Sequence, residues 1–185
     1  MNRRQLLTAV GGLGLTGGSV LAASGHLPVP SGVALGGRRA AETGLPLEVE
    51  AIDAPGSEAG RVTVPVPDTP TVIDLFATWC APCKEQMDAL SAVHAEYADR
   101  AAFVSVTNER IGGALSRDDV REWWRTHDGA WTVGLDPESD LMAALGASGL
   151  PYLAIADAAG RIRWRHAGVA SAATLRTELD RVLAE

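Results

Sequence analysis

Cysteine is nearly absent from this sequence, which contains two in 185 residues, Cys80 and Cys83. A framework of several structural disulfides is therefore excluded. A structural zinc site is also excluded as an explanation for the pair, because such a site takes four ligands and there is no second cysteine pair. The four histidines are scattered without ligand spacing. We therefore expect neither a bound metal nor an organic cofactor.

Lysine is also scarce, since Lys84 is the only one among 16 basic residues, and no acidic residue precedes Glu42. Residues 42–185 carry 12 basic and 23 acidic side chains, a net charge of −11. A domain this acidic repels phosphate groups, which argues against nucleic acid and anionic membrane surfaces as partners. The hydrophobic content of 46% allows one globular domain, which we expect to be a monomer.

A long uninterrupted apolar run is missing as well. The most apolar stretch near the start, residues 6–23, contains five glycines between positions 11 and 18 and would make a poor spanning helix. Before it stands Asn-Arg-Arg-Gln-Leu-Leu at positions 2–7, which resembles a twin-arginine export signal. We expect residues 1–25 to be this signal, with an uncleaved membrane anchor as the alternative, and the protein to be exported to a periplasmic or other extracytoplasmic space.

The next segment, residues 26–46, is rich in glycine, proline and alanine and is predicted to be a flexible linker. The folded domain is predicted to span residues 47–185, where periodic patterns begin. Its apolar runs predict strands and its three- and four-residue spacings predict helices. The predicted strands are 47–52, 61–64, 71–77, 102–107, 131–135, 151–157 and 161–165, and the predicted helices run through 87–97, 117–125, 136–145 and 171–185. Strands alternating with helices indicate an α/β fold with a parallel crossover.

The cysteine pair lies where the buried strand 71–77 turns into a helix, within Trp-Cys-Ala-Pro-Cys-Lys at positions 79–84. Unpaired N–H groups and the helix dipole stabilise a thiolate at a helix N-terminus. We expect Cys80 to be exposed, with a lowered pKa, and Cys83 to be buried one turn further on. Cys80 would then attack a disulfide, and Cys83 would resolve the mixed disulfide.

This strand, motif and helix resemble the active site of the thioredoxin fold. The residues at positions 75–83, Leu-Phe-Ala-Thr-Trp-Cys-Ala-Pro-Cys, are most similar to the TlpA/ResA-like thiol-disulfide oxidoreductases. The resemblance implies a central mixed sheet flanked by helices, an N-terminal β-hairpin, and a central strand–helix insertion at about 109–135. It also implies protein thiols and disulfides as substrates, and an upstream dithiol as electron donor.

By the same resemblance Pro151 is the cis-proline that faces the cysteine pair. Its missing N–H leaves the backbone of Leu150 free to pair with an extended substrate, as in strand addition. The alternative is an ordinary trans-proline at the start of a strand. Trp79, next to Cys80, is interpreted either as a shield and docking surface or as part of the core.

Asp74 stands in the middle of an apolar strand, where a carboxylate is costly unless it is paired or protonated. Burial should therefore raise its pKa. It lies six residues before Cys80, the position of the buried acid in thioredoxin, although many TlpA-like relatives carry asparagine there. The implied role is proton acceptor for Cys83, and the alternative is a purely structural acid.

The direction of electron flow is predicted from Pro82. Strong oxidants of this fold carry a histidine just before the second cysteine, which stabilises the thiolate and hence the reduced form. Without it we expect a disulfide reductase, with a midpoint nearer thioredoxin at about −270 mV than DsbA at about −120 mV.

Three other hypotheses compete. A structural disulfide is possible, but so small a loop constrains the unfolded chain only modestly. A peroxiredoxin-like antioxidant needs proline and threonine seven and three residues before its cysteine, where this chain has Ile73 and Ala77. A copper-handling protein that is not an enzyme would use both thiols and a histidine such as His166, although its relatives space the cysteines one residue wider.

Overall fold

The computed structural model describes residues 44–184, so the predicted export signal and nearly all of the predicted linker lie outside the described residues. The described chain contains seven strands and four helices. In chain order they are β1 Leu47–Ala51, β2 Gly60–Val64, β3 Thr71–Phe76, α1 Ala81–Tyr97, β4 Ala102–Thr107, α2 Arg117–Thr126, β5 Thr132–Leu135, α3 Asp140–Leu145, β6 Tyr152–Ala156, β7 Ile162–Ala167 and α4 Ala172–Leu183.

The strands form one mixed sheet in the order β2-β1-β5-β4-β3-β6-β7. Strands β3, β4 and β5 run parallel to one another, whereas β6 pairs antiparallel with β3 and β7 pairs antiparallel with β6. The predicted N-terminal hairpin is β1 with β2, and β1 joins the sheet by antiparallel pairing with β5. The predicted α/β class, mixed sheet and hairpin are confirmed, and the insertion supplies α2 and β5.

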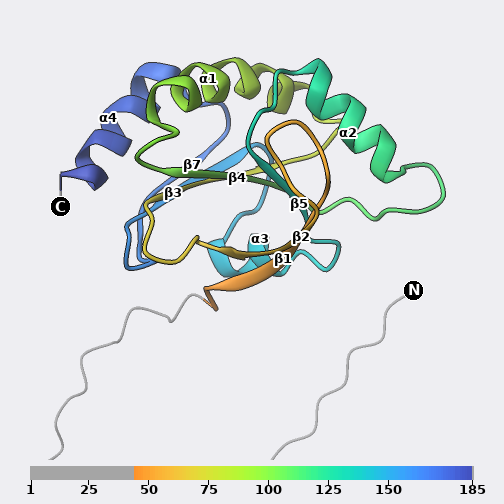
Figure 1. The fold of residues 1–185 in the computed structure, drawn as a ribbon, viewed down its shortest axis with the longest axis horizontal. Helices are drawn as coiled ribbons and strands as arrows, with labels where there is room; N and C mark the ends of the chain where they lie inside the picture. Colours follow the sequence, from red (N-terminus) through yellow and green to blue (C-terminus); the bar gives the residue numbers. More distant parts are fainter. Residues whose placement is uncertain (1–43, 185) are drawn as a thin grey trace, which may run out of the picture. The chain divides into compact units, whose positions relative to one another are not determined.

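Helices α1, α2 and α4 cover one face of the sheet, as Figure 1 shows. The face is apolar because alternate residues of each strand point to it, including Val72 and Phe76 of β3 and Phe103 of β4. Both cysteines belong to this buried cluster. The site is therefore anchored in the larger of the two cores.

Helix α3 lies on the opposite face, where Leu141 and Leu145 pack on Ile73, Leu75 and other strand residues. Strand β3 is buried along its whole length because it has a core on each side. Among residues 44–184, no helix combines the length and the apolar character needed to cross a bilayer.

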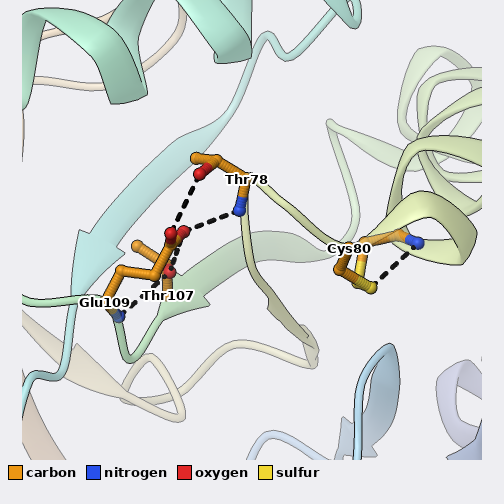
Figure 2. The surroundings of a disulfide bond; sticks show 5 residues. Thr78, Cys80, Thr107 and Glu109 are labelled. Atoms are coloured by element: carbon orange, nitrogen blue, oxygen red, sulfur yellow. Dashed lines mark hydrogen bonds between the residues drawn. A yellow bond between two sulfur atoms is a disulfide. The ribbon is translucent and has the colours of Figure 1, made fainter. Parts of the chain in front are cut away.

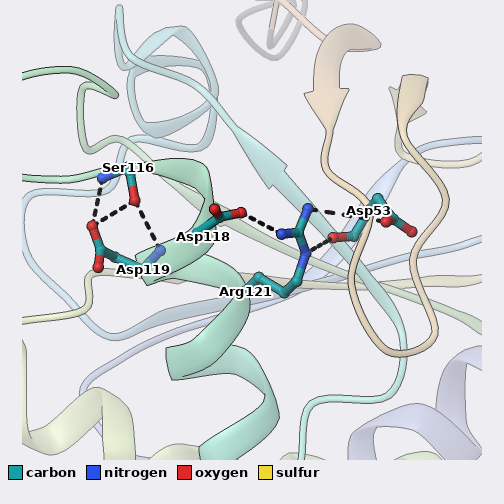
Figure 3. Close-up of polar contacts among 5 residues, drawn as sticks. All are labelled: Asp53, Ser116, Asp118, Asp119 and Arg121. Carbon is teal, nitrogen blue, oxygen red and sulfur yellow. Dashed lines mark hydrogen bonds and ion pairs between the residues drawn. The ribbon is translucent and has the colours of Figure 1, made fainter.

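Helix α2 begins as the sequence predicts. The hydroxyl of Ser116 accepts the N–H of Asp119 at 3.1 Å, and the carboxylate of Asp119 accepts the N–H of Ser116 at 2.8 Å, which is a capping box (Figure 3). Arg121, one turn further on, donates from Nε to the carbonyl of Asp53 at 2.6 Å and pairs with Asp118. The helix is thereby tied to the turn that follows β1.

The start of α3 differs from the sequence prediction, which placed it at Asp136. The helix begins at Asp140 because the carboxylate of Asp136 accepts the N–H groups of Asp140 and Leu141, at 3.1 and 2.8 Å, from outside the helix. The helix ends at Leu145, as predicted, and is followed by Gly146 in the left-handed conformation.

The connection between β1 and β2 folds back onto β5. Ser57 is buried there, where its hydroxyl donates to the carbonyl of Ile52 at 2.7 Å and accepts the N–H of Val133 at 3.1 Å. Gly56 has a φ of +72°, and a Cβ there would lie 2.0 Å from the carbonyl carbon of Ala130. Only glycine therefore permits this close approach of two backbones.

We predict that Gly56→Ala destabilises the fold far more than Gly160→Ala. Gly160 has a similar φ of +74° but nothing within 4 Å of an added Cβ. The left-handed conformation alone costs about 1–2 kcal/mol, and the clash at Gly56 should add at least about 2 kcal/mol. Urea unfolding of both variants measures the difference, and equal losses would show that the loop is free to move away.

Candidate functional site

Cys80 and Cys83 form a disulfide at the start of α1, with their Cα atoms 5.2 Å apart. Cys80 is the N-cap of the helix, and its sulfur accepts the N–H of Cys83 at 3.2 Å (Figure 2). Pro82 occupies the first turn, where a missing N–H breaks no helical hydrogen bond. The local sequence therefore turns a buried strand into a helix that begins at the sulfur.

Both sulfurs are shielded from solvent in this disulfide form. Cys83 is 1% exposed and Cys80 is 4% exposed, so the prediction of an exposed Cys80 is wrong here. The reason is that the Cys80 sulfur turns towards Cys83 and receives its N–H. The exposed neighbour is instead Trp79, at 72%, so its interpretation as core is excluded.

The main-chain N–H groups at the start of α1 favour an anionic sulfur. The first turn contains no acidic residue, and the chain's single lysine, Lys84, is exposed immediately after Cys83. Main-chain N–H groups at a helix start carry partial positive charge. In the reduced state the same N–H of Cys83 can stabilise a thiolate on Cys80.

The segment before the cysteines is held by Glu109, which the sequence analysis missed. Its carboxylate accepts the N–H of Thr78 at 2.6 Å and the hydroxyls of Thr78 and Thr107 at 2.9 and 3.1 Å (Figure 2). Glu109 follows β4, and Thr78 follows the parallel strand β3. Parallel strands end at the same edge of a sheet, so a polar residue just after β4 is expected to lie near the end of β3. That position was the signal by which Glu109 could have been found.

Pro151 reaches the same edge from β6. The Leu150–Pro151 bond is cis, as the resemblance implied. Tyr152 pairs with Leu75, so Pro151 lies just beyond the last β3 pair, where the chain leads to the cysteines. Leu150 packs against the buried cluster that contains both cysteines, and the carbonyl of Pro151 accepts the N–H of Gly168 at 2.9 Å.

Gln86 is a second residue that the sequence analysis missed. It is 1% exposed, and its amide both accepts the N–H of Ala170 at 2.7 Å and donates to the carbonyl of Ala170 at 3.2 Å. The clamp fastens α1, one turn after Cys83, to the segment after β7. The signal was its position between Cys83 and Leu90 on the buried face of a helix, where a glutamine needs partners.

Asp74 is buried at 2% exposure on the face of the sheet that holds the cysteines. Its Oδ2 accepts the hydroxyl of Ser105 at 2.8 Å, and Ser105 in turn accepts the indole N–H of Trp131 at 3.0 Å. Burial raises the pKa of Asp74 to about 7, and the hydrogen bond from Ser105 partly offsets that rise. The predicted rise in the pKa of Asp74 is confirmed.

The raised pKa of Asp74 predicts a specific pH dependence of stability. Between its ordinary pKa of 3.8 and about 7, the folded chain keeps a proton that the unfolded chain has released. The free energy of unfolding should therefore fall as the pH rises through this window. Asparagine does not ionise, so Asp74→Asn removes the free-energy cost of burying a carboxylate. The free energy of unfolding of the variant, minus that of the unaltered chain, should therefore be about 2–4 kcal/mol larger at pH 8 than at pH 4.

Urea unfolding of the oxidised protein at both pH values measures this difference. Asp99→Asn is the matched control, because Asp99 is an exposed aspartate. A pH-independent effect of Asp74→Asn would mean that Asp74 is ionised in the folded chain throughout.

Known proteins resemble this chain in sequence and in fold. Thioredoxin-like protein YneN of Bacillus subtilis (strain 168) is 28% identical over 109 residues, which span 59% of this chain and 62% of YneN, less than two thirds of that protein. Thiol-disulfide oxidoreductase YkuV of the same organism is 27% identical over 118 residues, spanning 64% of this chain and 80% of YkuV.

The crystal structure of the exposed lipoprotein thioredoxin Etrx1 from Streptococcus pneumoniae strain TIGR4 matches with a TM-score of 0.62 at 19% identity. The match covers 74% of this chain and 99% of Etrx1, and at this identity it shows a shared thioredoxin fold. The Redoxin family matches residues 62–183, from β2 to the end of α4. Because that match takes in both cysteines and more than half of the sequence, the chain belongs to the Redoxin family.

Proposed function

We propose that this protein is a thiol-disulfide oxidoreductase of the TlpA/ResA-like type, and that it works as a disulfide reductase. The observation that carries the proposal is the Cys80–Cys83 disulfide capping the start of α1. The names of YneN and YkuV support the reaction class. The β1–β2 hairpin and the α2–β5 insertion support the subtype, since both were expected from it.

The reaction begins with the reduced protein. The Cys80 thiolate attacks one sulfur of a substrate disulfide, forming a mixed disulfide and releasing the other substrate sulfur as a thiolate. Cys83 then loses its proton and attacks the Cys80 sulfur, which closes the Cys80–Cys83 disulfide and releases the second substrate thiolate. Two electrons pass from the protein to the substrate, and an upstream dithiol restores the reduced form by the reverse exchange.

Asp74 is the proposed acceptor of the Cys83 proton. Its pKa of about 7 lets the carboxyl group hold or release a proton near neutral pH. It is buried on the same face of the sheet as Cys83. The proton then passes to solvent or to the departing substrate thiolate.

The proposed substrate surface surrounds the sulfurs. The two exposed large hydrophobic side chains of residues 44–184 are Trp79, next to Cys80, and Val169. Val169 stands between Gly168, which bonds to Pro151, and Ala170, which Gln86 holds. An extended polypeptide could pair with the backbone of Leu150 while its side chains contact these two residues, which favours a protein substrate.

We predict that Cys83→Ser traps a covalent complex with the substrate, because the mixed disulfide on Cys80 cannot be resolved. Cys80→Ser is the matched control and should trap nothing. The unaltered protein should reduce insulin disulfides, and its midpoint in equilibrium with glutathione or a thioredoxin standard should lie nearer to about −270 mV than to about −120 mV.

A midpoint above about −170 mV would overturn the proposed direction and indicate a thiol oxidant. Equal trapping by both cysteine variants would contradict the assignment of Cys80 as the nucleophile. Tight copper binding by the reduced protein without insulin reduction would favour the copper-handling alternative.

Export is the second part of the proposal. It is supported by the arginine pair Arg3–Arg4 before a glycine-rich apolar stretch, and by the exposed location that the name of Etrx1 gives for that protein. We predict that replacing both arginines by lysine keeps the charge but retains the protein in the cytoplasm, because the export machinery reads the arginine pair. Cell fractionation measures this, and undiminished export of the double variant would exclude a twin-arginine signal.

A further inference from the structure

Three buried side chains from neighbouring strands form one hydrogen-bonded chain beneath α1. Asp74 of β3 pairs in register with Ser105 of β4, and Trp131 immediately precedes β5, the next strand of the sheet. Ser105 is fully buried, and Trp131 is 4% exposed. The contacts run from the Trp131 indole to the Ser105 hydroxyl at 3.0 Å, and from there to Oδ2 of Asp74 at 2.8 Å.

The chemistry of these groups fixes the direction of the chain. An indole N–H can only donate, so the oxygen of Ser105 must accept from Trp131. A serine hydroxyl has one hydrogen, and the geometry directs it to Oδ2 of Asp74. Oδ2 is therefore an acceptor, whereas Oδ1 is buried and has no hydrogen-bond partner among residues 44–184.

We propose that Ser105 and Trp131 are positioning residues that assign the exchangeable proton of Asp74 to Oδ1 and stabilise the carboxylate left when that proton departs. The inference rests on the proposed function, since it specifies which oxygen of the proton acceptor carries the proton and what stabilises its ionised form. Neither residue touches the reacting sulfurs, and both act through Asp74.

The stabilisation follows from burial. A carboxylate in an apolar cluster is strongly disfavoured without a donor, and Ser105 supplies one charge-assisted hydrogen bond. Trp131 cannot easily turn away, because its ring contacts Trp124, Phe103 and His94 at centroid distances of 4.9, 6.1 and 5.0 Å. The indole thus holds the Ser105 hydroxyl in its donating orientation.

Other titratable groups on the surrounding elements could add to the titration of Asp74. They are Cys80, Cys83, His94 and Tyr97 on or next to α1, Glu109 after β4, and Asp180 of α4, which accepts the Tyr97 hydroxyl. In the oxidised protein the two cysteines do not titrate, because they are joined in a disulfide. Titration of the oxidised protein therefore reports on Asp74 without a contribution from Cys83, its proposed proton donor.

The test follows the Asp74 carboxyl carbon by ¹³C NMR in the full-length oxidised protein between pH 4 and pH 10. Ser105→Ala should raise the titration midpoint of Asp74 by about one pH unit or more, because the carboxylate loses its donor. Trp131→Phe should raise it by less, because the hydroxyl remains but is free to turn. Ser91→Ala is the matched control, since Ser91 bonds to the carbonyl of Asp128 on the surface.

Ser105→Thr retains the hydroxyl and should keep the midpoint of the unaltered chain, which also covers the case in which Ser105→Ala does not fold. An unchanged midpoint in both Ser105→Ala and Trp131→Phe would overturn the inference, whatever the activity. A shifted midpoint in a protein that fails to reduce insulin would leave the inference standing and reject the proposed function instead. If both hold, the pH profile of insulin reduction should move with the midpoint.

Discussion

The hydrogen bond from the main-chain N–H of Cys83 to the sulfur of Cys80 is the contact on which this site depends. It makes a sulfur atom the cap of α1, and so it places the reactive group where the helix dipole favours negative charge. The remaining contacts around the site fix the position of that helix start. Glu109 holds the segment that enters it, and Gln86 holds the turn that leaves it.

Several of these contacts place polar groups inside an apolar core, which costs free energy unless partners are present. Gln86 pairs both its amide N–H and its amide oxygen with Ala170, and the partly buried Glu109 pairs its carboxylate with two threonines. Asp74 is different, because one of its oxygens has a donor and the other has none among the described residues. This difference supports the proposed role of Asp74 as a group that changes its protonation.

The sequence was sufficient for the features that depend on local chemistry. The start of α2 at Arg117, the strand from Ala102 to Thr107 and the raised pKa of Asp74 follow from spacing, apolar runs and burial. The pairing of Asp74 with Ser105 could not be predicted, because Ser105 lies on the neighbouring strand and the contact depends on the register of the sheet. The prediction that Cys80 is exposed was wrong because it treated the residue as a free thiol, whereas the disulfide turns the sulfur inwards.

Lys84 is exposed beside the disulfide, and it is the only lysine in the sequence. Apart from the α-amino group of the chain, reagents that acylate amines therefore have a single target, one residue from the second cysteine. A fluorophore or a photo-activated crosslinker can be attached at the rim of the site without introducing another cysteine. The native lysine is thus a labelling site for following the binding and release of a partner.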